Sequence, residues 1–132
     1  MEAVVDTSVL RGLLLEEDPL HETATLLARG YETLRVPSIV VHELAWGLRR
    51  SLGWRRARAV LEIVLSDPAY RYEPVLREDA WLASRDPRRY EDLLIVAVAA
   101  RLGLPLLTLD TGMAKLARRH GVEAPAPRRE GN

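Results

Sequence analysis

Four acidic residues stand where a folding chain usually places apolar side chains: Asp6, Glu43, Asp92 and Asp110. Asp6 and Asp110 each end a short apolar run, and Asp92 opens the most apolar helix that the sequence predicts. A buried carboxylate without a partner is strongly destabilising. Two carboxylates about 4 Å apart also repel by roughly 4 kcal/mol at an effective dielectric constant near 20. Protons or divalent cations are therefore needed to neutralise such a set.

Three of these acids have a simpler explanation when each is taken alone. Asp6 and Asp110 can cap the helices that follow them. An acid in the first turn of a helix is favoured by the helix dipole, and this holds for Asp92 and equally for its neighbour Glu91. Capping and ligand binding both remain open for these residues at this point.

Glu43 gives the sharper signal, because it projects into the apolar arc of its own predicted helix, beside Leu44. A salt bridge to Arg50, two turns further on, is the structural alternative. Oxygen-only ligands suit Mg²⁺ or Mn²⁺ rather than zinc. Such ions activate water for attack on phosphorus. The acids therefore indicate a metal-dependent hydrolase.

The elements that must position these residues alternate between strands and helices. We predict strands at 2–6, 34–36, 72–75 and 105–109, and a further edge strand at 122–124. We predict helices at 7–16, 19–30, 38–52, 54–65, 77–84, 90–102 and 111–120. The expected N-caps are Thr7 or Ser8, Asp18 and Ser38, and Pro74 makes the strand around it weak or an edge strand.

This alternation predicts a three-layer α/β/α fold with a central parallel sheet of four to five strands. In a parallel sheet, ligands bind beyond the carboxyl ends of the strands. Because Asp6 and Asp110 each follow a strand directly, both are expected on that edge of the sheet.

The composition is that of a soluble globular domain, with 132 residues, 48% of them hydrophobic and 29% charged. The absence of cysteine excludes disulfides, zinc thiolates and thiol catalysis. The longest apolar run, Leu93 to Ala100, is too short to span a membrane, and no signal peptide is visible. We expect a cytoplasmic protein with one domain at 1–124 and a polar tail at 125–132.

The net charge is zero, but the basic residues are unevenly distributed. Five arginines lie between Arg49 and Arg58. The simplest interpretation is a solvated helix face, and the functional one is contact with RNA phosphates beside the acidic site.

Together these residues resemble a PIN domain, the metal-dependent ribonuclease fold found in VapC toxins. The stretches 4–10 and 38–44 resemble the first two acidic motifs of the family. The third and fourth motifs share one register over nineteen residues, carried by Asp92, Ile95, Ala97, Ala99, Gly103, Thr108 and Asp110. The resemblance runs from Val4 to about Ala117, and its departures include Met113, where an aromatic residue is usual.

The resemblance implies an endoribonuclease, the toxin of a type II VapBC toxin–antitoxin pair, that forms a homodimer and binds an antitoxin. Asp6, Glu43, Asp92 and Asp110 would hold one or two Mg²⁺ or Mn²⁺ ions. Ser8 and Thr108 match positions that orient carboxylates or water. The tryptophans, expected in the core or at an interface, would line a groove for an antitoxin segment; they are Trp46, Trp54 and Trp81.

Two alternatives stay open: a PIN nuclease of RNA processing that is not a toxin, and a non-catalytic PIN-like module that binds RNA or protein. Phosphoryl transfer through an aspartyl nucleophile at Asp6 is disfavoured. Phosphatases of that class usually carry a second Asp two residues later, where this chain has Ser8.

Overall fold

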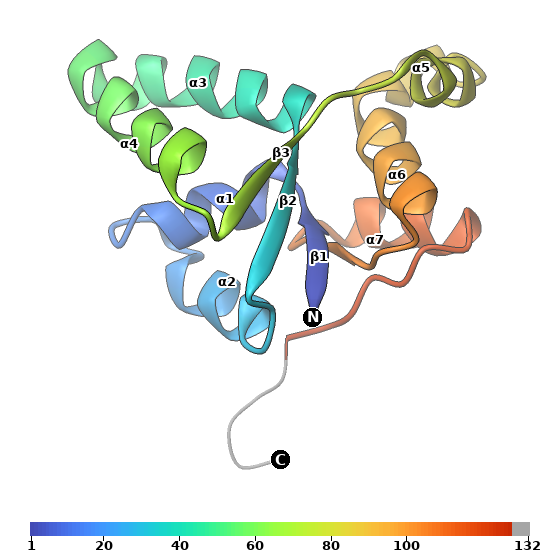
Figure 1. The fold of residues 1–132 in the computed structure, drawn as a ribbon, viewed down its shortest axis with the longest axis horizontal. Helices are drawn as coiled ribbons and strands as arrows, with labels where there is room; N and C mark the ends of the chain where they lie inside the picture. Colours follow the sequence, from blue (N-terminus) through green and yellow to red (C-terminus); the bar gives the residue numbers. More distant parts are fainter. Residues whose placement is uncertain (128–132) are drawn as a thin grey trace.

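The computed structural model describes residues 1–127, in which four parallel strands form one sheet flanked by helices (Figure 1). The strand order is β3–β2–β1–β4. The strands are β1 (Glu2–Val5), β2 (Thr33–Pro37), β3 (Tyr70–Glu73) and β4 (Leu106–Leu107). The predicted α/β class and parallel sheet are confirmed, and β3 is an edge strand, as Pro74 indicates.

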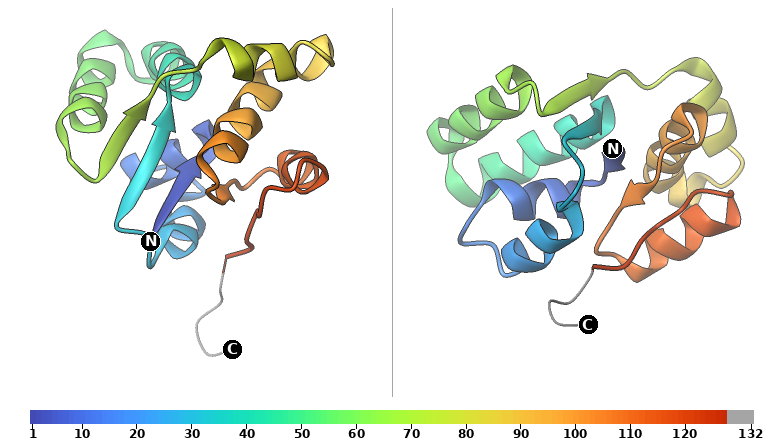
Figure 2. Two further views of the ribbon diagram at one scale, coloured as in Figure 1. Left: turned by 45° about the vertical axis from the view of Figure 1, so that its right-hand side comes forward. Right: turned by 60° about the horizontal axis from the view of Figure 1, so that its bottom comes forward.

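The helices fall into two groups, one on each side of the strands. In Figure 1, α1–α4 lie to the left of the strands and α5–α7 to the right, and both views of Figure 2 show the same division. The helices are α1 (Thr7–Leu14), α2 (His21–Ala28), α3 (Ser38–Leu52), α4 (Trp54–Ser66), α5 (Arg77–Ala83), α6 (Tyr90–Leu102) and α7 (Thr111–Arg119), with a 3-10 turn η1 (Pro87–Arg89) before α6. None of the helices within residues 1–127 is both long and apolar enough to cross a membrane.

The core is built around β1 and α6. Ala3, Val4 and Val5 of β1 are fully buried between two neighbouring strands, and residues 93–99 of α6 are all buried. An apolar helix without a polar face needs such complete burial. It ends at Gly103, which has a left-handed φ of 67° that glycine adopts without strain. The predicted buried helix at 90–102 is confirmed in type and in both bounds.

The last strand is shorter than predicted. β4 contains only Leu106 and Leu107, because Thr108 leaves the ladder and turns its hydroxyl toward Asp6. The predicted edge strand at 122–124 is not formed; the segment accepts a backbone hydrogen bond from β4, from the Leu106 N–H to the Glu123 carbonyl (2.8 Å), and the Val122 N–H donates to the Ala117 carbonyl of α7 (2.9 Å). The expected tail at 125–132 lies outside the described residues from position 128 onward.

The helix caps also differ from prediction. The side chain of Asp6, rather than Thr7 or Ser8, caps α1. Asp18 accepts from the Leu20 N–H in a turn before α2. Ser38 does not cap its own helix; its hydroxyl accepts from the Val75 N–H at 3.0 Å and fastens the chain after β3 to the start of α3.

The three tryptophans are all exposed, so the expectation that they could lie in the core is wrong. Two of them, Trp46 on α3 and Trp54 on α4, have an arginine guanidinium over the ring.

One buried ion pair joins α5 to α6. The Asp79 side chain is 2% exposed and receives three hydrogen bonds from Arg101, at 3.0–3.3 Å. It also accepts from the Leu76 N–H at 2.9 Å, and Arg101 reaches the Pro74 carbonyl at 3.2 Å. This buried carboxylate is therefore fully compensated by a guanidinium.

Replacing Asp79 by alanine is expected to destabilise the protein by about 3 kcal/mol, because the largely covered guanidinium of Arg101 loses its counter-ion and the Leu76 N–H loses its acceptor. Urea unfolding measures the change. Asp86→Ala is the matched control, since Asp86 pairs with the largely exposed Arg88 and should change stability by less than about 1 kcal/mol. Equal losses in the two variants would contradict this role of Asp79.

Candidate active site

The pairing register of β1 with β4 brings Asp6 and Thr108 side by side. Val5 is paired with Leu107, and Asp6 and Thr108 are the next residues of their chains. The Asp6 N–H donates to the Leu107 carbonyl at 3.1 Å, which continues the ladder by one step. Both side chains therefore lie at the carboxyl edge of the sheet, where a parallel fold places its ligand sites.

The carboxylate of Asp6 is buried and receives its hydrogen bonds from neutral donors. The Ser8 hydroxyl donates to Oδ1 at 2.7 Å, the Val9 N–H donates to the same oxygen at 3.0 Å, and the Thr108 hydroxyl donates to Oδ2. The side chain is only 4% exposed. Burial raises the pKa of Asp6; the three hydrogen bonds oppose this rise and the charge of Asp110 adds to it.

Asp110 lies beside Asp6 and caps α7. Its Oδ1 accepts from the N–H groups of Gly112 (2.8 Å) and Met113 (3.1 Å), and its own N–H donates to the Thr108 hydroxyl (3.1 Å). The capping explanation is thus correct for both Asp6 and Asp110. It does not exclude ligand binding, because Asp110 is exposed and its charge is felt by Asp6.

Glu43 is half-buried on α3 and belongs to a second acidic group. Thr7 donates its hydroxyl to Glu43 Oε1 at 2.8 Å. Burial is the largest cause of a raised pKa for Glu43, and close contact with Glu91 and the charge of Asp92 raise this pKa further. The alternative partner, Arg50, lies instead 4.7 Å from the centre of the Trp46 ring.

Asp92, in the first turn of α6, pairs with an arginine that the sequence pattern did not single out. Arg89 Nη2 donates to Asp92 Oδ2 at 3.1 Å. A β-carbon placed on Gly112 would lie 3.8 Å from the same Nη2 and 3.2 Å from Asp110 Oδ1. The guanidinium of Arg89 therefore pairs with Asp92 and lies near Gly112, at the start of α7. Its position three residues before Asp92 is the only signal of this role in the sequence.

The structure brings all six predicted site residues to one edge of the sheet, in two groups. The first group is Asp6, Ser8, Thr108 and Asp110; the second is Glu43 and Asp92, with Glu91 added. Thr7, the residue after Asp6, links the groups through its hydrogen bond to Glu43, and Arg89 pairs with Asp92 in the second group.

The donor set of this edge fits Mg²⁺ or Mn²⁺, because every available ligand is a carboxylate or hydroxyl oxygen. Among residues 1–127, however, no three acidic or histidine side chains already converge as a metal-binding group. Rotation of the side chains would have to join the two groups around an ion.

Comparison with family models identifies a PIN domain over residues 3–119. The chain belongs to the PIN domain family. The PIN fold that the motifs predicted is confirmed by this match and by the parallel sheet with its flanking helices.

Three solved structures illustrate the similarity of fold. VapC20 of Mycobacterium tuberculosis, described as a sarcin–ricin loop cleaving toxin, is 26% identical, with a TM-score of 0.73 over 86% of this chain and 94% of that one. VapBC2 from Rickettsia felis, bound to promoter DNA, is 19% identical, with a TM-score of 0.67 over 95% and 98%. FitAcB from Neisseria gonorrhoeae is 21% identical, with a TM-score of 0.69 over 96% and 98%. No curated protein matches the chain.

The raised pKa values give a pH dependence of stability with a definite sign. Asp6 and Glu43 hold protons more tightly in the folded than in the unfolded protein. The stability that they contribute is present below about pH 4 and is lost as the pH rises through the raised pKa values. In EDTA, Asp6→Asn is therefore expected to gain stability relative to wild type as the pH rises from about 4 to about 8.

Urea unfolding of both proteins across this range measures the difference. The fold should tolerate the amide that replaces the carboxylate, because the hydroxyls of Ser8 and Thr108 can rotate to accept from it. Glu17→Gln is the control, since the pKa of exposed Glu17 is lowered and the pH trend should have the opposite sign. If the stability gain of Asp6→Asn over wild type stays constant or shrinks as the pH rises, the folded protein does not disfavour the charged form of Asp6.

Proposed function

We propose that this protein is a Mg²⁺- or Mn²⁺-dependent endoribonuclease and the toxin of a type II VapBC pair. The observation that supports this most directly is the acidic edge itself. In a PIN fold, it combines a buried carboxylate held by neutral donors with four further acids in two neighbouring groups: Asp110 beside Asp6, and Glu91 and Asp92 beside Glu43. Phosphodiester hydrolysis with water activated by a metal ion is the chemistry that such an edge supplies best.

In this proposal Asp6, Glu43, Asp92 and Asp110 hold the ion or ions. When bound, the ion activates a water molecule and stabilises the leaving oxygen. The other residues keep the ligands in place. Ser8 and Thr108 fix the carboxylate of Asp6 from two sides, and Thr7 does the same for Glu43.

The exposed arginines of α3 and α4 can attract a negatively charged substrate, which the acidic site alone would repel. Five of them lie between Arg49 and Arg58, and all five are exposed. Arginine binds phosphate through a planar fork of donors. RNA is the substrate class that fits both features, and the sarcin–ricin loop, which the similar VapC20 cleaves, is the first RNA to test.

Asp6→Asn and Glu43→Gln are each expected to lower the rate of RNA cleavage by about a hundredfold or more, because each removes a negative ligand of the ion. Cleavage of purified ribosomes and of a labelled sarcin–ricin hairpin, with Mg²⁺, with Mn²⁺ and with EDTA, measures this loss.

Glu32→Gln, a change of the same type at an exposed position that pairs with the N-terminus, should keep wild-type activity. Cation-dependent cleavage that persists in both active-site variants would overturn the proposal. Metal binding without cleavage of any RNA would instead favour the non-catalytic module. Cleavage without growth arrest on expression would favour a nuclease of RNA processing.

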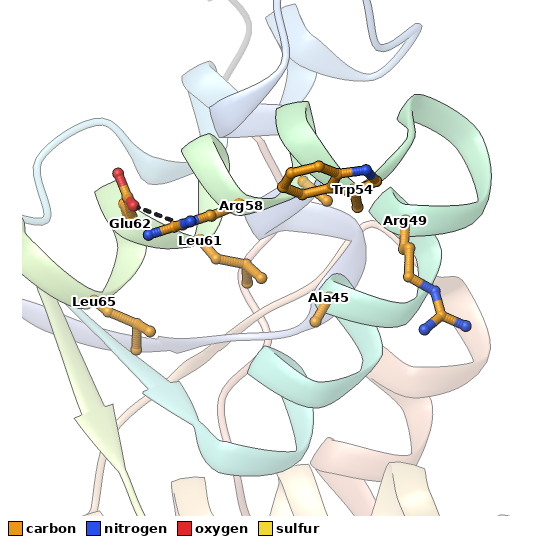
Figure 3. Close-up of a pocket in the computed structure, with 8 residues that line it drawn as sticks. Ala45, Arg49, Trp54, Arg58, Leu61, Glu62 and Leu65 are labelled. Carbon is orange, nitrogen blue, oxygen red and sulfur yellow. Dashed lines mark hydrogen bonds and ion pairs between the residues drawn. The ribbon is translucent and has the colours of Figure 1, made fainter.

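A groove between α3 and α4 gives the antitoxin a place to bind (Figure 3). It has a volume of about 340 Å³. Ala45 and Leu61 point into it from the two helices, and Trp54 and Leu65 line it further along. Arg49 and Arg58 stand at the rim, where Arg58 also pairs with Glu62 at 3.2 Å. An apolar floor with a basic rim suits an amphipathic segment with acidic residues on its polar side.

Leu65→Asp is expected to weaken binding of the antitoxin by about tenfold or more while leaving RNA cleavage unchanged, because it puts a charge on the floor of the groove. The probe is the product of a short reading frame next to this gene, with affinity measured by calorimetry. Leu76→Asp, at another exposed leucine before α5, is the control. Equal affinity of the Leu65 variant and wild type would place the antitoxin elsewhere. The homodimer remains a prediction, which sedimentation of the wild type would test.

A further inference from the structure

Arg89 occupies a distinctive place in the acidic edge. It belongs to η1, the turn that leads into α6, and its N–H donates to the Asp86 carbonyl at 3.0 Å. Its guanidinium extends from this turn to Asp92 and lies near Gly112, at the start of α7. It thus brings a positive charge to the group of Glu43, Glu91 and Asp92, where Glu43 also accepts from the neutral hydroxyl of Thr7.

Electrostatics explains why a cation is stable there. Glu43, Glu91 and Asp92 are close enough for the second and third to raise the pKa of the first. Asp110 has the same effect on Asp6. The guanidinium of Arg89, bound to Asp92, lowers the repulsion within the group of Glu43, Glu91 and Asp92, and its planar donors match carboxylate oxygens.

We propose that Arg89 is the protein's own counter-ion for the acidic edge and that it competes with the divalent cation for Asp92. This inference rests on the proposed metal-dependent function. An ion that takes Asp92 as a ligand must accept the oxygen that now accepts from Arg89 Nη2. It must also tolerate, or expel, the positive charge of Arg89 beside that oxygen.

The ion pair between Arg89 and Asp92 is exposed enough for either side chain to exchange its partner. The side chains of Arg89 and Asp92 are 34% and 41% exposed, whereas the buried partner in the α5–α6 ion pair, Asp79, is 2% exposed. Ion pairs exposed to this degree contribute little to stability. Arg89 can therefore leave Asp92 for solvent or for an RNA phosphate without unfolding the start of α6.

Calorimetric titration of the EDTA-treated and dialysed protein with MnCl₂ tests the competition without any measurement of activity. Arg89→Gln is expected to bind Mn²⁺ about three- to tenfold more tightly than wild type, because the competing cation is gone. Arg89→Lys keeps the charge but loses the planar fork, and its affinity should lie between the two.

Arg88→Gln is the matched control, because it removes the same charge one residue earlier, from a side chain that is largely exposed and pairs with Asp86. Its Mn²⁺ affinity should stay near that of wild type. Unchanged affinity in Arg89→Gln, or equal tightening in Arg88→Gln, would overturn the inference and leave the proposed function standing. Absence of Mn²⁺ binding in wild type and in every variant would overturn the metal-dependent function and, with it, the inference.

Discussion

The hydrogen bond from Thr108 to Asp6 across the β1–β4 seam is the contact on which the site depends. Burial disfavours the charged form of a carboxylate, and only neutral donors oppose that effect at Asp6. Asp79 shows the other solution in the same chain, because its equally buried carboxylate is met by Arg101. One buried acid is thus fully compensated within the fold, and the other retains a demand for positive charge. This lack of a positive partner distinguishes the carboxylate of Asp6, which is suited to bind a cation, from that of Asp79, which belongs to a structural ion pair.

The register between β1 and β4 and the burial of α6 hold the residues of the site in place. The pairing of Val5 with Leu107 fixes which residues emerge together from two adjacent strands, and a shift by one residue would turn Thr108 away from Asp6. In the sequence, α6 lies between β3 and β4 and connects these two parallel strands. Its first turn therefore lies at the carboxyl edge of the sheet. Since residues 93–99 are buried, α6 cannot rotate without exposing apolar surface, and Asp92 is held at that edge.

Patterns that depend on local chemistry could be read from the sequence. The apolar run and Gly103 gave α6 its correct bounds, and the positions of the acids after strands predicted their common edge. Contacts between distant segments could not be read in this way. Serine is a favoured N-cap residue, yet the Ser38 hydroxyl accepts a hydrogen bond from the Val75 N–H, after β3. β4 is short because Thr108 bonds to Asp6 instead of continuing the ladder. Arg89 looked like one more arginine among many, because its place at the acidic edge depends on Glu43, the distant neighbour of its partner Asp92.

Capping and ligand binding are compatible at this edge because a carboxylate has more acceptor sites than a cap uses. An ionised carboxylate offers about four lone-pair sites on two oxygens. Asp110 uses one oxygen, Oδ1, for both N–H groups of its cap. Asp6 gives two sites on Oδ1 to Ser8 and Val9 and one on Oδ2 to Thr108. The caps fix each carboxylate to a helix start and leave acceptor capacity on its second oxygen. A cation bound at this edge would therefore find Asp6 and Asp110 already oriented, because folding has already restricted these two side chains.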